Sequence, residues 1–139
     1  MFLETDKRQP ASSLSPSVLA FMGDAVYGML VREKLCEVNR PSGELHRLSV
    51  KFVSASSQSE AYKIIGDLLS EKEQAVFKRG RNFRTSNTPK SSTAAQYHTA
   101  TGVEALFGYL YLSNNNRRAV ELFDVIWNAQ SSEALNASR

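Results

Sequence analysis

The chain has 139 residues, which fits a single domain spanning 1–139, with flexible ends expected at about 1–13 and 130–139. Its hydrophobic fraction of 42% and charged fraction of 22% are ordinary for a globular protein, and its formal net charge is +3. No apolar run could span a bilayer, the acidic start lacks a signal-peptide core, and a single cysteine cannot form an internal disulfide. We therefore expect a cytoplasmic protein without membrane contact.

The spacing of apolar residues predicts helices from the start of the chain. The first begins at Ser15, a good N-cap followed by Pro16, and runs to about Glu37. Two further helical segments follow at about 43–54 and 57–69, and these could also form one bent helix. No alternating pattern typical of strands occurs, so the sequence predicts helices rather than a sheet.

The second half of the chain is predicted to contain three helices and one long loop. A capping box at 70–73 opens a short helix through Phe77. Residues 80–96 lose all periodicity, and loops of this length within a compact domain are usually functional or disordered. A helix over about 97–112 and a last helix to about Asn128 complete an all-α fold.

Two acidic residues, Asp24 and Glu104, are each the only charge in an apolar run of a predicted helix. Each has Ala four residues before it and Gly four residues after it, which places it in a stripe of small side chains. A buried charge is costly unless it is paired or binds metal, so we predict that the two carboxylates approach closely and share a divalent cation. The alternative is that each acid is partly exposed or bonds a buried backbone group, and the pattern favours neither.

Positive charge is concentrated in and before the predicted loop. No acid occurs between Gln74 and Val103, whereas five basic residues do. Arg and Lys among hydroxyl and backbone donors suit a phosphate backbone, and the loop leads directly into the helix of Glu104. An acid pair beside such a segment is typical of a metal-dependent phosphodiesterase, although a solvated loop that aids solubility is the alternative. The basic residues are Lys78, Arg79, Arg81, Arg84 and Lys90.

From about Leu14 to Leu112, the chain resembles ribonuclease III catalytic domains. Their signature helix resembles Phe21-Met22-Gly23-Asp24-Ala25-Val26, and their second acidic helix resembles Val103-Glu104-Ala105-Leu106-Phe107-Gly108. We expect no double-stranded-RNA-binding domain, which is typical of the compact subfamily, Mini-ribonuclease III. The same subfamily is indicated by Lys78-Arg79-Gly80-Arg81-Asn82, Thr88-Pro89-Lys90 and Tyr97.

The resemblance implies an all-α endoribonuclease domain that works as a homodimer, with Phe21 and Met22 at the interface. It implies that Asp24 and Glu104 are both catalytic residues and metal ligands, with Mg²⁺ as cofactor and Mn²⁺ as a substitute. The substrate implied is double-stranded RNA, in particular the stem at the ends of the large-subunit (23S) ribosomal RNA precursor. With duplex RNA as the substrate, we expect the basic segment to position the RNA backbone, through Lys78, Arg79, Arg81, Asn82, Arg84 and Lys90.

The sequence departs from full-length ribonuclease III at the acids expected around the metal. Those positions hold Ser17, Ala20, Ser42 and Thr101. Mini-ribonuclease III sequences similarly have fewer of these acids. We therefore expect an active enzyme whose Mg²⁺ keeps several waters and RNA oxygens as ligands.

Two other functions remain possible from the sequence. The first is a non-catalytic ribonuclease III fold that binds RNA as a ribosome assembly factor and needs no metal. The second is a helical dimer that acts as a scaffold and has no preference for duplex RNA.

Overall fold

In the residues that the structure describes there are six α-helices and two short 3₁₀ helices. This computed structural model describes residues 10–83 and 93–136, and within them there is no strand and no helix that could cross a membrane. The all-α prediction is confirmed. The α-helices are α1 (Pro16–Leu35), α2 (Ser42–Val53), α3 (Ala55–Ile65), α4 (Glu71–Asn82), α5 (Ala94–Leu112) and α6 (Asn116–Asn136).

Local caps fix the starts of several helices where the sequence predicts them. The Oγ atom of Ser15 accepts a hydrogen bond from the Val18 backbone N–H at 3.3 Å, at the start of α1. At the start of α4, the Glu73 N–H donates to Ser70 Oγ at 3.1 Å and the Ser70 N–H donates to Glu73 Oε1 at 2.8 Å. These bonds satisfy backbone donors that have no partner within the helix.

The predicted segments at 43–54 and 57–69 are two separate helices. Ser54 between them is extended, with φ −62° and ψ 155°, and its Oγ accepts the Ser57 N–H at 3.2 Å. This is an N-cap, so α3 begins anew rather than continuing α2 around a bend. A 3₁₀ turn, Gly66–Leu68, then leads toward α4.

The predicted loop at 80–96 was too long at both ends. Helix α4 continues past Phe77 to Asn82, because Gly80 lies so close to α5 that a β-carbon there would stand 2.7 Å from Ala105 Cβ. Helix α5 begins at Ala94, behind a capping box between Thr93 and Gln96 that the sequence analysis missed. Residues 84–92 lie outside the described ranges.

The last helix, α6, was also predicted too short. It runs to Asn136 instead of ending at about Asn128, and Ala134 and Leu135 pack against the main core. Ahead of α1, a 3₁₀ turn at Ala11–Ser13 buries Ala11, which lies within the predicted flexible start.

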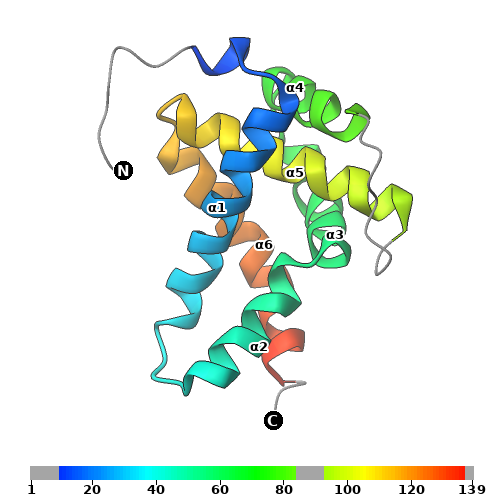
Figure 1. The fold of residues 1–139 in the computed structure, drawn as a ribbon. Coiled ribbons are helices and arrows are strands. Elements are labelled where there is room, and N and C mark those ends of the chain that lie inside the picture. The colour runs from blue at the N-terminus through cyan, green and yellow to red at the C-terminus, as the bar shows by residue number, and fades with distance from the viewer. Residues whose placement is uncertain (1–9, 84–92, 137–139) are drawn as a thin grey trace.

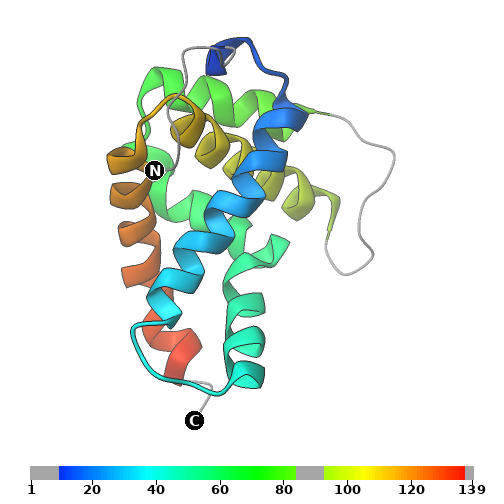
Figure 2. The same ribbon diagram turned by 60° about the vertical axis from the view of Figure 1, so that its left-hand side comes forward.

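Helix α5 lies at the centre of the domain, packed against α1, α3, α4 and α6 (Figures 1 and 2). Because it is enclosed by other helices, it is apolar on almost every side. The Phe107 ring meets Tyr27 of α1 edge-on at 5.2 Å between centroids, and Tyr27 meets Phe123 of α6 at 5.4 Å. These edge-to-face contacts fix α1, α5 and α6 against one another.

Candidate active site

The two helices that carry the lone acids, α1 and α5, cross with their backbones in contact (Figures 1 and 2). A β-carbon at Gly23 of α1 would overlap the backbone carbonyl of Glu104, and one at Gly108 of α5 would overlap the carbonyl of Leu19. Only glycine has no side chain to obstruct such an approach. Since Gly23 directly precedes Asp24, and Gly108 follows Glu104 by one turn, the crossing point also sets where the acids meet.

The structure brings the carboxylates of Asp24 and Glu104 together, as the sequence analysis predicted. They lie within hydrogen-bonding reach of each other when one carries a proton. Asp24 is exposed, whereas Glu104 is partly buried. Among the described residues, no cationic side chain forms an ion pair with either acid. The described part of the protein therefore supplies no cation to balance the charge of the pair.

The buried member of the pair has an unusual proton affinity. Burial raises the pKa of Glu104 to about 8, and the neighbouring charge of Asp24 adds to the increase, while the side-chain amide of Gln58 opposes it. Removing water disfavours a charged carboxylate, and a like charge nearby does the same. A perturbed acid at an open site is a common sign of function.

An open pocket of about 370 Å³ exposes both acids to solvent. Its lining includes three of the four positions where full-length ribonuclease III would carry further acids, namely Ser17, Ala20 and Thr101. An acid at any of these positions would face the same space as Asp24 and Glu104. The fourth position, Ser42, does not line this pocket.

The donor set fits a hydrated Mg²⁺ ion. No group of three or more His, Cys, Asp or Glu side chains gathers anywhere in the ranges described, so Asp24 and Glu104 are the carboxylates available. Mg²⁺ prefers oxygen ligands, usually keeps several waters and binds through one or two carboxylates. Two adjacent carboxyl groups at an open pocket, one of which gives up its proton when metal binds, meet those requirements.

Three aromatic residues also line the pocket: Phe21, which the sequence analysis placed at the dimer interface, and Phe83 and Tyr97, which it did not assign to the site. Phe83 follows the end of α4, and Tyr97 lies in the first turn of α5. The sequence analysis used Tyr97 only as a mark of the subfamily, because only the tertiary structure brings Phe83 and Tyr97 together. The end of α4 therefore forms part of the pocket wall.

The predicted RNA-binding residues divide between the described and undescribed parts of the chain. Lys78, Arg79 and Asn82 are exposed on α4, and Arg81 is partly exposed with its guanidinium 5.8 Å from the Phe77 ring centroid. Arg79 donates from Nη2 to the Leu14 carbonyl at 3.1 Å, and Arg81 Nε donates to Asn82 Oδ1 at 3.2 Å. The remaining two, Arg84 and Lys90, lie outside the described residues.

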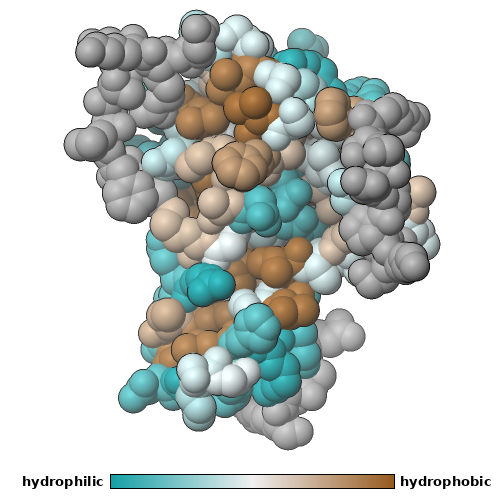
Figure 3. All heavy atoms as spheres, in the orientation of Figure 1, coloured by the Kyte–Doolittle hydropathy of each residue, from teal (hydrophilic) through white to brown (hydrophobic). Residues whose placement is uncertain are grey.

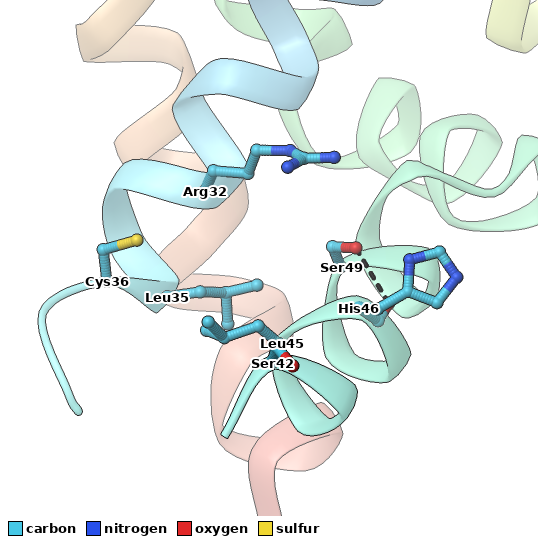
Figure 4. A pocket seen from close by; sticks show the side chains of 7 residues that line it. All are labelled: Arg32, Leu35, Cys36, Ser42, Leu45, His46 and Ser49. Carbon is cyan, nitrogen blue, oxygen red and sulfur yellow. Dashed lines mark hydrogen bonds between the residues drawn. The ribbon is translucent and has the colours of Figure 1, made fainter. Parts of the chain in front are cut away.

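A second cavity, of about 240 Å³, lies at the other end of α1 (Figure 4). Arg32 extends from α1 toward α2, where Ser49 Oγ donates to the His46 carbonyl at 2.8 Å. Cys36 and Ser42 also line this cavity. It contains neither of the paired acids, so it is separate from the candidate active site.

The sequence also matches a known family model. The Ribonuclease III domain model matches residues 17–115, which include both acids and both crossing glycines. The chain belongs to the ribonuclease III family. Members of this family depend on divalent metal, act on double-stranded RNA and are typically dimeric, and this ribonuclease III domain is accordingly an endoribonuclease.

Individual relatives agree with this ribonuclease III assignment over most of the chain. A Mini-ribonuclease 3 from Thermoanaerobacter sp. (strain X514) is 44% identical, with 89% of this chain and 90% of the relative aligned. A Mini-ribonuclease 3 from Clostridium tetani is 35% identical, with 93% and 87% aligned. The X-ray structure of a Fusobacterium nucleatum protein has a TM-score of 0.79 at 26% identity, covering 88% of this chain and 100% of that chain.

Proposed function

We propose that this endoribonuclease cleaves double-stranded RNA with Mg²⁺, which Mn²⁺ can replace, as a cytoplasmic homodimer. The observation that carries the proposal is the pairing of Asp24 and Glu104 at one open pocket, without a neutralising cation among the described residues. Resemblance to the compact Mini-ribonuclease III subfamily supports the stem of the large-subunit (23S) ribosomal RNA precursor as the substrate.

Asp24 and Glu104 would hold the Mg²⁺ ion, each through its carboxylate. The bound ion would activate a water and stabilise charge on the leaving oxygen of the phosphodiester. Glu104 must lose its proton to bind metal, and its raised pKa makes proton and metal compete for the same oxygen atoms. Asp24 is exposed and would contact solvent and substrate directly, whereas Glu104 is partly buried against the core.

The basic residues would hold the RNA backbone beside the acids. Phe83, which caps the end of α4, lines the pocket, so the basic residues of the last turns of α4 lie near the entrance to the site. A-form RNA is recognised mainly by shape and backbone contacts, which suits arginine and lysine better than base-reading groups. This role is proposed for Lys78, Arg79, Arg81, Asn82, Arg84 and Lys90.

The test of this function is cleavage of a long RNA duplex with and without Mg²⁺. Wild type should cleave only with the metal, and Asp24→Asn should lose about 10³-fold in rate, or about 4 kcal/mol of transition-state stabilisation. Binding of the duplex without cleavage by wild type, unaffected by Asp24→Asn, would instead support a non-catalytic RNA-binding assembly factor. Equal binding of single strands would indicate a scaffold.

The proposed dimer rests on the outer face of α1. Phe21 is 83% exposed and Val18 47% exposed, and Figure 3 shows hydrophobic side chains gathered over the N-terminal half of this helix. Met22 is partly buried and packs against the main core, so Phe21 is the more accessible of the two predicted interface residues. A two-fold axis would let one such patch cover its own copy.

Sedimentation of a charged variant tests the dimer. Phe21→Lys should shift the protein to a monomer at micromolar concentration, because a large exposed aromatic at the centre of an interface contributes about 2 kcal/mol or more. Val120→Lys on α6, at a position 45% exposed, is the matched control and should remain dimeric. A monomeric wild type would refute the dimer.

A further inference from the structure

Gln58 on α3 is a buried polar residue whose place in the sequence gave no hint of function. Three polar or charged residues are buried in the described part of the chain, and Gln58 is only 2% exposed. The other two are well partnered: Ser49 Oγ donates to the His46 carbonyl, and Glu73 accepts from Ser70 and Arg118. Gln58 differs because its Nε2 atom makes no well-formed hydrogen bond within the described ranges.

The amide of Gln58 faces the acid pair. Its side chain lies close enough to the Glu104 carboxylate to interact with it. Helix α3, which carries Gln58, packs against α5, so the amide approaches Glu104 from the protein interior. Asp24 approaches the same carboxylate from α1, on the side that is open to solvent.

A buried donor without a good partner is costly and calls for an explanation. Hydrogen bonds at catalytic sites are often long until a ligand is bound, and then they tighten. Groups behind a metal ligand commonly orient it and tune its affinity for the metal. The orientation of Glu104 matters more here, because the positions of three further acids hold Ser17, Ala20 and Thr101, which leaves Glu104 as one of two carboxylates at the pocket.

We propose that Gln58 is a positioning residue for Glu104. Its amide N–H holds the Glu104 carboxylate in the orientation that binds the divalent cation together with Asp24. Once the metal is bound, one carboxylate oxygen would accept from the amide, which leaves the other for the metal. The inference rests on the proposed metal-dependent function and adds to it a residue that touches neither the metal nor the RNA.

The test compares Gln58→Met with wild type by calorimetric titration of Mn²⁺ into the RNA-free protein. Methionine keeps the length of the side chain and removes the donor. We expect the dissociation constant for Mn²⁺ to rise about tenfold and kcat on a duplex to fall by a similar factor. KM for the duplex should stay unchanged, because Gln58 is buried away from the RNA. The unfolding midpoint should not fall, since an unsatisfied buried donor is removed.

Gln74→Met is the matched control, because Gln74 has a purely structural environment. Its Nε2 donates to the Gly66 carbonyl at 2.8 Å and its Oε1 accepts from the Tyr62 hydroxyl at 3.0 Å. We expect this variant to lose stability and keep wild-type affinity for Mn²⁺. The opposite responses of the two glutamines would separate positioning of Glu104 from general packing.

The possible failures are distinguishable. If wild type neither binds Mn²⁺ nor cleaves a duplex, both the proposed function and this inference are wrong. If wild type does both and Gln58→Met binds Mn²⁺ equally well, only the inference is wrong. If Gln58→Met does not fold, Gln58→Asn is measured in its place. Asparagine is one methylene shorter, so its amide lies farther from Glu104. Failure of both variants to fold would make Gln58 a packing residue and overturn the inference.

Discussion

Asp24 and Glu104 have almost the same sequence surroundings and very different environments. Both are lone acids in apolar helices with Ala four residues before and Gly four residues after. In the structure Asp24 is exposed, whereas Glu104 is partly buried and its pKa is raised to about 8. The difference arises because α5 is enclosed by four other helices while α1 has one face open.

The glycines that follow the two acids differ just as much. Gly108 lies at the crossing, where a β-carbon would overlap the Leu19 carbonyl, whereas a β-carbon at Gly28 would meet nothing within 4 Å. The glycine on α1 that permits the crossing is Gly23, directly before the acid. A repeated local pattern therefore does not imply a repeated role, and this contrast can be tested directly.

The largest expected effect is on the crossing itself. Gly108→Ala should destabilise the protein by about 3 kcal/mol or more, because two backbones must separate to admit the methyl group. Gly28→Ala is the control and should stabilise it by up to about 1 kcal/mol through helix propensity. Urea unfolding at one protein concentration measures both. Equal effects of the two substitutions would show that the backbones do not touch at the crossing.

The next effect concerns the charge on Glu104. Its folded pKa of about 8 lies above the ordinary glutamate pKa of 4.5, so the folded state binds more protons between these pH values and stability falls as pH rises through them. Glu104→Gln should remove that fall and stabilise the metal-free protein at pH 8.5 by about 2 kcal/mol after allowance for solvent screening, with little change at pH 4.5.

Asp24→Asn is the comparison for this pH effect. It removes only the charge repulsion acting on Glu104, so we expect a smaller gain in stability at pH 8.5 than Glu104→Gln gives. Urea unfolding in the presence of EDTA at both pH values measures the difference. A wild-type stability that rises between pH 4.5 and pH 8.5 would contradict a buried, proton-retaining Glu104.

A smaller effect should follow from divalent metal. At a Mg²⁺ concentration ten times its dissociation constant, binding to the folded state alone would stabilise wild type by about 1.4 kcal/mol. The gain should increase above pH 8, where Glu104 no longer has to lose a proton, and should be absent in Asp24→Asn. Thermal unfolding with and without Mg²⁺ measures it. An equal gain in Asp24→Asn would place the metal elsewhere.

The smallest effect concerns the basic end of α4. Arg81→Ala should weaken duplex binding by about 1 kcal/mol or less and lower the dependence of log affinity on log salt by about one unit. Arg117→Ala is the control, because Arg117 is an exposed cation on α6 that does not line the acid pocket. Binding titrations at several salt concentrations measure both. An unchanged salt slope in Arg81→Ala would remove that residue from the RNA contact.

Local sequence was sufficient for the features that depend on near neighbours. The caps at Ser15 and at Ser70 with Glu73 were predicted because their partners lie within three residues. The helical class follows from apolar spacing, and the two lone acids were identified because charges are rare in such runs. The motifs around those acids were enough to indicate the ribonuclease III family.

Helix ends were predicted less well because they depend on partners far along the chain. The segment of α4 after Phe77 is basic and contains a glycine, which disfavours a helix. It is nevertheless helical to Asn82, where Gly80 packs closely against α5. Helix α6 likewise continues past Asn128, with Leu135 packed on the core. Propensity could not show either contact, because tertiary packing overrides it.

The composition of the site was decided by tertiary structure. Sequence determined that Asp24 and Glu104 are lone acids in apolar helices, but not that one would be exposed and the other partly buried with a raised pKa. It gave no sign that Phe83 lines their pocket or that Gln58 faces Glu104 from α3. Those relations depend on how closely two backbones approach at Gly23 and Gly108, and that distance is set by contacts between helices rather than within them.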